Sequence, residues 1–215
     1  MAQIFPKWTN QVPVVIIATV IVLGAAATGF FWYYASPEYT DIGYRPEQPV
    51  AYSHKLHAGD LGLDCRYCHT TVEVSASANI PPTQTCMNCH TLVKPESEKL
   101  ALVIESWITG KPMEWVRVHM LPDYAYFDHS AHITVGVGCV SCHGNVAEME
   151  KVMQVKPLSM SWCLDCHRNP DEHLRPLSEV TNMKWEPSAD QLAFAARVIK
   201  EKNISPPVDC SGCHR

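Results

Sequence analysis

Hydrophobic residues are concentrated in one long run near the N-terminus. Residues 13–34, PVVIIATVIVLGAAATGFFWYY, contain no charged side chain, and about twenty apolar residues are enough for a helix to cross a bilayer. Aromatic residues flank the run, as is typical at a membrane–water interface: Trp8 on one side and Phe30, Phe31, Trp32, Tyr33 and Tyr34 on the other. The pattern predicts a transmembrane helix over residues 13–34.

A cleaved signal peptide is the alternative interpretation of this run. Ala25, Ala26 and Ala27 provide the small residues of a cleavage site. The apolar run continues past these alanines, which favours an uncleaved anchor. Residues 35–50, ASPEYTDIGYRPEQPV, are polar and contain proline, so we expect a tether between the helix and the rest of the chain.

Two later segments have helical periodicity. Residues 95–109 begin at Pro95, place apolar side chains on one stripe and stop before Gly110. Residues 188–203 begin with Ser188 and Gln191, which form a capping-box pattern, and also carry an apolar face. We expect both helices to be packing elements. The remaining sequence, rich in proline and short polar runs, predicts loops.

The cysteines change this picture of a helix followed by loops. The chain has ten of them, and all belong to five C-x-x-C pairs that are each followed by histidine: CRYCH, CMNCH, CVSCH, CLDCH and CSGCH. This pattern is typical of covalent attachment of c-type haem, in which the two cysteines form thioether bonds and the histidine binds the iron. A zinc site would need Cys and His in sets of four, and a disulfide framework would be indifferent to the histidine.

The motifs therefore predict five covalently bound haem c groups. The thioether cysteines are Cys65, Cys68, Cys86, Cys89, Cys139, Cys142, Cys163, Cys166, Cys210 and Cys213. The proximal iron ligands are His69, His90, His143, His167 and His214. Because c-type haem is attached on the outer side of the bacterial inner membrane, we expect residues 1–12 in the cytoplasm and residues 35–215 in the periplasm.

An internal repeat organises these motifs. YSHKLHAGDLGLDCRYCH at 52–69 and FDHSAHITVGVGCVSCH at 127–143 both have an aromatic residue, H-x-x-H, glycine and then C-x-x-C-H. Another haem motif follows each copy. The predicted fold is a multihaem cytochrome c with one transmembrane helix and a mostly irregular, short-helix domain over residues 51–215. Its two-haem modules would span 51–126 and 127–180, and the fifth haem 181–215.

The repeated H-x-x-H pairs are the best candidates for the sixth iron ligands. Residues three apart on a helical turn point to nearly the same side, so each pair can serve two neighbouring haems. This predicts His54, His57, His129 and His132 as ligands of four irons. For the fifth iron the first choice is His119, and the alternatives are His173 or one of Met149, Met153, Met160 and Met183, since methionine also binds haem iron.

The net charge and the number of candidate iron ligands argue against several classes of function. The formal net charge of −5 argues against nucleic acid and is compatible with docking to a cationic partner. A multihaem nitrogen-compound reductase needs an open iron position, and six candidate distal histidines for five irons argue against one. Pentahaem nitrite reductases also carry C-x-x-C-K, which does not occur here. A tetrahaem quinol dehydrogenase shares the anchor but lacks the fifth motif.

The whole chain resembles the pentahaem cytochrome c subunit of bacterial alternative complex III. The resemblance is carried by the five motifs and by WVRVHMLPDYAYFDHSAH, GVGCVSCHG and PLSMSWCLDCHRNP. It implies an electron-transfer subunit, not itself an enzyme, that relays electrons to periplasmic acceptors. It also implies an iron–sulfur subunit, polytopic quinol-binding subunits, and a monohaem cytochrome c or terminal oxidase as partners. A c7-like multihaem subunit of another quinone-linked complex is the alternative.

Overall fold

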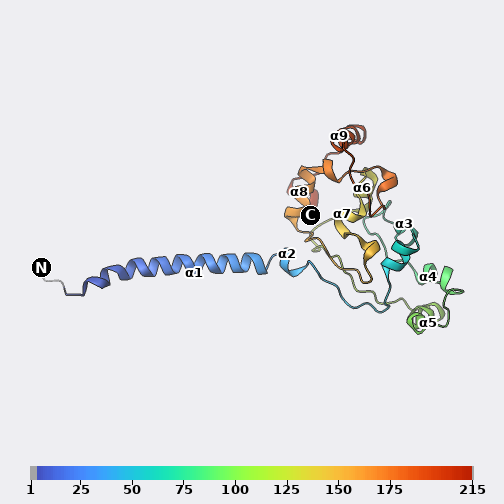
Figure 1. The fold of residues 1–215 in the computed structure, drawn as a ribbon, viewed down its shortest axis with the longest axis horizontal. Helices are drawn as coiled ribbons and strands as arrows, with labels where there is room; N and C mark the ends of the chain where they lie inside the picture. The colour runs from blue at the N-terminus through green and yellow to red at the C-terminus, as the bar shows by residue number, and fades with distance from the viewer. Residues whose placement is uncertain (1–3, 215) are drawn as a thin grey trace. The chain divides into compact units, whose positions relative to one another are not determined.

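The computed structural model describes residues 4–214, which form two compact units (Figure 1). The first unit ends at Asp41 and the second begins at Ile42. Each unit is described by itself.

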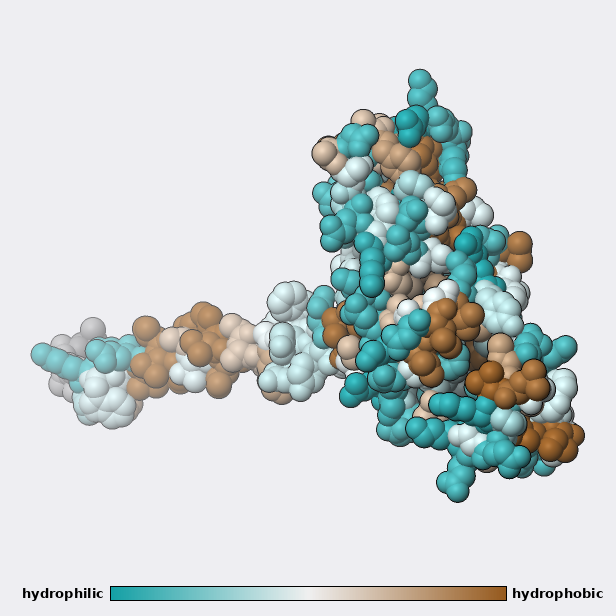
Figure 2. Space-filling model, turned by 45° about the vertical axis from the view of Figure 1, so that its right-hand side comes forward, coloured by the Kyte–Doolittle hydropathy of each residue, from teal (hydrophilic) through white to brown (hydrophobic). Residues whose placement is uncertain are grey.

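The first unit consists of a single long helix with short helical segments at both ends. A 3-10 turn, η1 (Lys7–Gln11), leads into α1 (Val12–Tyr34), and α2 (Pro37–Thr40) follows. Proline in the first turn of α1 costs no hydrogen bond, because the first N–H groups of a helix have no partner within it. None of the residues of α1 is buried, and Figure 2 shows apolar side chains along the visible face of this helix. Residues 7–34 are long and apolar enough to cross a membrane, as predicted.

The second unit contains short helices joined by irregular segments, and residues 42–214 include no named strand. Its α-helices are α3 (Cys65–Cys68), α4 (Thr83–His90), α5 (Ala101–Thr109), α6 (His129–Val135), α7 (Cys139–His143), α8 (Met160–Arg168), α9 (Gln191–Lys202) and α10 (Cys210–Cys213). The shorter turns are η2 (Lys55–Asp60), η3 (Glu98–Leu100), η4 (Val146–Glu148), η5 (Pro170–His173) and η6 (Leu177–Glu179). This is the short-helix, irregular architecture that the sequence predicts.

The polypeptide core of this unit is small. Val50, Met87 and Val103 form one buried cluster. A second cluster, formed by Val72, Ile133 and Val180, packs against Cys139. A soluble domain of about 150 residues normally buries about 70% of the surface of its unfolded chain, which these clusters are far too small to provide. The unit therefore fits a domain whose core is completed by large apolar groups.

Two details of the predicted helices differ in the structure. The helix expected at 95–109 begins only at Ala101, because residues 98–100 form the 3-10 turn η3. The capping box predicted at Ser188 is wrong: the Ser188 hydroxyl bonds Asp190. The Gln191 side chain instead donates to the carbonyls of Asp171 and Leu174 at 2.8 and 2.7 Å, which joins α9 to η5.

The predicted tether is only partly separate from the haem-binding unit. Gly43 N donates to the Gln154 carbonyl, and Gln154 N donates to the Tyr44 carbonyl. The Glu47 carboxylate also pairs with Lys151. Residues 43–50 consequently pack within the second unit.

Candidate haem-binding site

Each of the five C-x-x-C pairs lies on a helical turn. The pairs occupy α3, α4, α7, α8 and α10, so the two cysteines of each pair, three residues apart, are on nearly the same side. Side-chain caps start three of these turns: Asp64 accepts from Arg66 N, Ser159 from Trp162 N and Asp209 from Gly212 N. None of the ten cysteines forms a disulfide bond with another, so each pair is available for attachment to haem.

Most of the candidate iron ligands have one ring nitrogen already bonded. In seven of them Nδ1 lies 2.7–3.0 Å from a backbone carbonyl oxygen: His57, His69, His90, His129, His132, His167 and His214. A histidine that binds a metal through one nitrogen usually donates from the other to a carbonyl or carboxylate, which fixes the ring and its tautomer. Nε2 of these seven residues is thereby left as the ligand atom.

Burial keeps three further candidate histidines neutral, which is the form that binds a metal. Burial lowers the pKa of His143 to about 3 and that of His54 to about 4, with neighbouring imidazoles adding to both shifts. Burial also lowers the pKa of His119. His54 Nδ1 and His119 Nε2 are buried without a hydrogen-bond partner.

Three pairs of imidazoles have the spacing of ligands on opposite sides of one metal ion. An imidazole nitrogen lies about 1.2 Å from the ring centroid and binds a metal at about 2 Å, so such rings have centroids about 6.3 Å apart. The centroids are 6.2 Å apart for His57 and His90, 6.1 Å for His132 and His167, and 6.3 Å for His129 and His143. The arrangement fits axial ligation of haem iron by pairs of histidines.

Residues 4–214 contain no group of three or more His, Cys, Asp or Glu side chains placed to hold one metal ion. A zinc site needs four such ligands together. Axial pairs are the arrangement that haem needs, because the porphyrin supplies the other four nitrogens.

The two copies of the repeat have the same local geometry. In the first copy Tyr52 stacks on His57 at 4.4 Å and meets His54 edge-on at 4.8 Å. In the second copy Phe127 stacks on His132 at 4.6 Å and meets His129 edge-on at 4.8 Å. The aromatic residue of each repeat therefore orients both histidines of its H-x-x-H pair. In the first copy this turn is the π-helical η2, and in the second it is α6.

The structure associates His119 with the third motif. Its ring lies 4.4 Å from that of His143 at 80°, a separation too short for an iron between the two rings. His173 lies in η5, directly after α8. Among the methionines, Met160 is 65% exposed, and the end of the Met149 side chain lies close to Gly144, next to His143.

Contacts between motifs arrange them in a row that differs from their order in the chain. Asn88 in the second motif donates to the Tyr67 hydroxyl in the first at 3.1 Å. The first and third motifs meet at the turn that ends at Asn182, because Thr181 donates to Asp64 at 2.8 Å and Cys139 N donates to the Val180 carbonyl at 3.0 Å.

The row continues towards the C-terminus. α6 places His129 6.3 Å from His143 of the third motif and His132 6.1 Å from His167 of the fourth, between ring centroids. The fourth motif contacts the segment before the fifth through His167 Nδ1 and the Pro207 carbonyl, 2.7 Å apart. In Figure 1 the helices α4, α3, α7 and α8 follow one another across the second unit in this order.

The carbonyl acceptors and these contacts were not found by sequence reasoning. Asn79, Ala76 and Pro207 contribute only their backbone oxygens, and any residue type carries such an oxygen. No side-chain pattern could have marked these positions.

Comparison with known proteins agrees with this site. Residues 125–215 match the family of cytochrome c7 and related cytochrome c, and residues 35–120 match the class III cytochrome c family. The multihaem cytochrome c subunit of menaquinone reductase from Nitratidesulfovibrio vulgaris is 29% identical over 173 residues, which are 71% of this chain and 81% of that protein. The chain is therefore a multihaem cytochrome c of the class III and c7-like kind.

Proposed function

We propose that the chain is a membrane-anchored pentahaem cytochrome c that carries electrons within a respiratory quinone-linked complex. It takes electrons from a quinol-oxidising or iron–sulfur partner and passes them to periplasmic acceptors or a terminal oxidase. The observation that carries this proposal is the set of three imidazole pairs at 6.1–6.3 Å. Two imidazoles on one iron would leave no position for substrate there, which supports an electron carrier that is not itself an enzyme.

Haem c, when bound, supplies one-electron oxidation and reduction. The residues of this chain would attach it through the five cysteine pairs and orient it through the carbonyl-bonded imidazoles. We assign His57 opposite His90, His132 opposite His167 and His129 opposite His143. His54 would serve the iron at His69, because His57, the other histidine of its H-x-x-H pair, is assigned opposite His90.

The iron bound to His214 would take its sixth ligand from His173 or a methionine in this proposal. His119 is not assigned to it, because its ring lies at the third motif. His119, the first choice from the sequence, would serve this iron only if its ring left His143. Ligation by histidine and methionine raises the potential of a haem relative to two histidines. His173→Ala would make the His214 haem high-spin if His173 is the ligand and would leave it unchanged if a methionine is.

The motif contacts support one order of electron transfer along the row. The path would run through the haems at His90, His69, His143, His167 and His214, so that the second and fifth motifs form its two ends. Electrons would enter at one end and leave at the other.

The quinone-linked partner follows from the relative and from the anchor. The related protein is named as a subunit of menaquinone reductase, whereas the resemblance of the motifs is to alternative complex III. We propose that the chain belongs to an alternative complex III, in which its partners are an iron–sulfur subunit and polytopic quinol-binding subunits. We propose no nucleic-acid partner. A c7-like subunit of a quinone-reducing complex is the second candidate.

Only Thr19 and Thr28 interrupt the apolar run of α1. The Thr28 hydroxyl bonds the Gly24 carbonyl, so quinol chemistry would belong to another subunit.

The first test is haem quantitation by pyridine haemochrome together with EPR of the oxidised full-length protein. We expect five covalently bound haems per chain, all low-spin. A large high-spin signal would indicate an open iron position and would contradict the electron-carrier proposal.

Variants of the distal ligands test the assigned pairs. His57→Ala and His132→Ala should each retain five haems, because the thioether bonds are untouched, and each should convert one low-spin haem to high-spin. His119→Ala is the matched control, since His119 is buried among the same histidines but has no assigned iron. Unchanged low-spin spectra in both of the first two variants would refute the pairs.

The anchor and the complex are tested on native membranes. The full chain should remain in the membrane fraction, and a version with residues 1–34 replaced by a cleavable signal peptide should become a soluble periplasmic protein with five haems. A soluble full-length protein would identify the helix as a cleaved signal. Subunits that co-purify with the full chain, and the direction of quinone turnover, distinguish the two candidate complexes.

A further inference from the structure

Arg175 is a buried cation next to one of the haem-attachment cysteines. The residue is 5% exposed. Its guanidinium carbon lies 4.5 Å from the centre of the Trp185 ring, and Nη1 donates to the carbonyl oxygens of Glu179 and Asn182 at 3.5 and 3.2 Å. Nε is buried and has no hydrogen-bond partner. Arginine stays protonated in proteins, so a full positive charge is held away from water.

The guanidinium is packed against the chain directly before the third haem motif. A Cβ atom at Gly138 would overlap the guanidinium of Arg175, so only glycine allows this approach. Cys139 is the next residue, and its N–H bonds the Val180 carbonyl on the same turn that accepts from Arg175. The position of the charge is therefore determined relative to Cys139 by the backbone on both sides.

Within residues 4–214 no carboxylate forms an ion pair with Arg175. Glu179 contributes its backbone oxygen to the guanidinium, and its carboxylate accepts a hydrogen bond from the Asn182 side chain. In this part of the chain the guanidinium therefore hydrogen-bonds only neutral carbonyl groups, while the Glu179 carboxylate attracts its charge without forming an ion pair with it.

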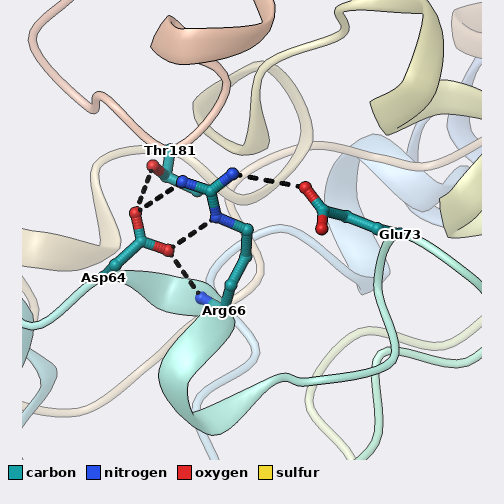
Figure 3. Close-up of polar contacts among 4 residues, drawn as sticks. All are labelled: Asp64, Arg66, Glu73 and Thr181. Atoms are coloured by element: carbon teal, nitrogen blue, oxygen red, sulfur yellow. Dashed lines mark hydrogen bonds and ion pairs between the residues drawn. The ribbon is translucent and has the colours of Figure 1, made fainter.

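In the first module, the residue before the first haem-attachment cysteine is a carboxylate that pairs with a partly exposed arginine. Asp64 precedes Cys65 as Gly138 precedes Cys139. In Figure 3 the guanidinium of Arg66 lies between Asp64 and Glu73, and the Thr181 hydroxyl donates to the same Asp64 oxygen as Arg66 Nη2. The side chain of Arg66 is 40% exposed and paired with two carboxylates, so solvent and these partners screen its charge.

We propose that Arg175 raises the reduction potential of the haem attached at Cys139 and Cys142 above that of the haem attached at Cys65 and Cys68. The inference rests on the proposed haem function of these cysteines. Reduction of the iron removes one positive charge, so a nearby buried cation favours the reduced form. Since the first and third motifs are neighbours in the row, the charge difference directs electrons from the first module towards the second.

The test is a potentiometric titration of the full-length holoprotein and its Arg175→Gln variant. Glutamine keeps a donor for the carbonyl groups and removes the charge. We expect the equilibrium constant for reduction of one haem to fall about tenfold, which for a one-electron step is about 59 mV. Arg175→Lys keeps the charge and should leave that step within about threefold of the wild type.

The matched control is Arg66→Gln, which removes the same charge beside the equivalent cysteine. Because that site is exposed and already contains two carboxylates, the shift should stay below about threefold and disappear in high salt. The Arg175→Gln shift should persist in high salt, because the site is buried.

Glu179→Gln provides a second measurement that leaves Arg175 and its backbone acceptors in place, because Glu179 bonds the guanidinium through its backbone oxygen. The substitution removes a carboxylate that offsets part of the Arg175 charge, so the same step should rise, by up to about threefold. It also decides the outcome if Arg175→Gln does not fold.

The outcomes separate this inference from the proposed function. A wild-type chain without covalent haem would remove the proposed function. Five low-spin haems in every variant, with no step lowered in Arg175→Gln and none raised in Glu179→Gln, would overturn the role of Arg175 alone. An equal shift in Arg175→Gln and Arg175→Lys would show that the side chain acts by shape and not by charge.

Discussion

Residues of the same type have different roles in this chain because their surroundings differ. His57 and His132 have their Nδ1 atoms bonded to carbonyls four residues before them, within one helical turn. His69 and His129 reach carbonyls in the irregular segment 75–79, which is 10 residues away in sequence for the first and 53 for the second. Local geometry orients one class of ligand, and the tertiary fold orients the other.

Asp64 illustrates how one side chain stabilises a motif. It caps α3 and accepts hydrogen bonds from Arg66 and Thr181 (Figure 3). Hydrogen bonds from Arg66, above all, lower the pKa of Asp64 from 3.8 to about 2. Because the pKa is lower in the folded state, this stabilisation is present above about pH 4 and is lost as the pH falls towards 2.

We therefore expect Asp64→Asn to lower the apparent free energy of unfolding by about 1 kcal/mol at pH 7, a value limited by the exposure of the pair. The difference from the wild type should shrink as the pH approaches 2, as measured by guanidinium unfolding of the haem-loaded protein. Asp209→Asn is the control, because Asp209 caps α10 without an arginine partner. A loss that is the same at pH 7 and pH 2.5 would contradict the linkage.

At the scale of elements, α6 is a central part of the site. This seven-residue helix carries both histidines of the second repeat, begins at the Asp128 cap and ends at Gly136. Gly136 has a φ of 104°, which favours glycine, and an added Cβ would overlap the Arg175 carbonyl. Directly after α6, Val137 forms an antiparallel β-bridge with Leu174, which fixes the end of the helix next to Arg175.

Gly136→Ala should destabilise the protein by more than about 3 kcal/mol, because a left-handed backbone and a steric overlap act together. Gly110→Ala is a matched control: Gly110 also ends a helix with positive φ, but nothing lies within 4 Å of its added Cβ. It should cost only about 1 kcal/mol. Thermal unfolding of both variants measures the difference, and equal losses would show that the overlap is relieved by movement of the backbone.

Secondary structure from sequence was most reliable where one pattern is long. The apolar run predicts α1 to within one residue of its start. Gln191 was misassigned because a capping box is a local rule, and its side chain found two buried carbonyls on η5 instead. Ala101 begins α5 later than the apolar stripe suggests, since the residues before it form tighter turns.

At the scale of the whole molecule, the second unit has too little side-chain packing to be stable by itself. Its buried hydrophobic residues are Val50, Val72, Met87, Val103, Ile133, Leu174, Val180 and Ala195. We expect residues 35–215, produced without haem attachment, to be unfolded, because conformational entropy outweighs the burial that these residues provide.

Limited proteolysis and near-UV circular dichroism of this haem-free chain test the expectation. It should be cleaved rapidly and show no near-UV signal. Cys210→Ser with Cys213→Ser, produced with haem attachment, is the control: it removes only the motif at one end of the row and should leave the rest resistant. A protease-resistant haem-free chain would show that the polypeptide alone forms a stable core.

The sequence by itself determined the chemistry of this protein: ten cysteines and their following histidines predict the attachment sites, and a period of three places each pair on one helical turn. These are local properties, readable along the chain. Only the tertiary structure decided which histidines face each other, that the second motif lies beyond the first in the row, and that Arg175 is buried beside Cys139 with no ion pair among the described residues. Such relations depend on contacts between residues far apart in sequence, and no short-range pattern specifies which distant segments meet.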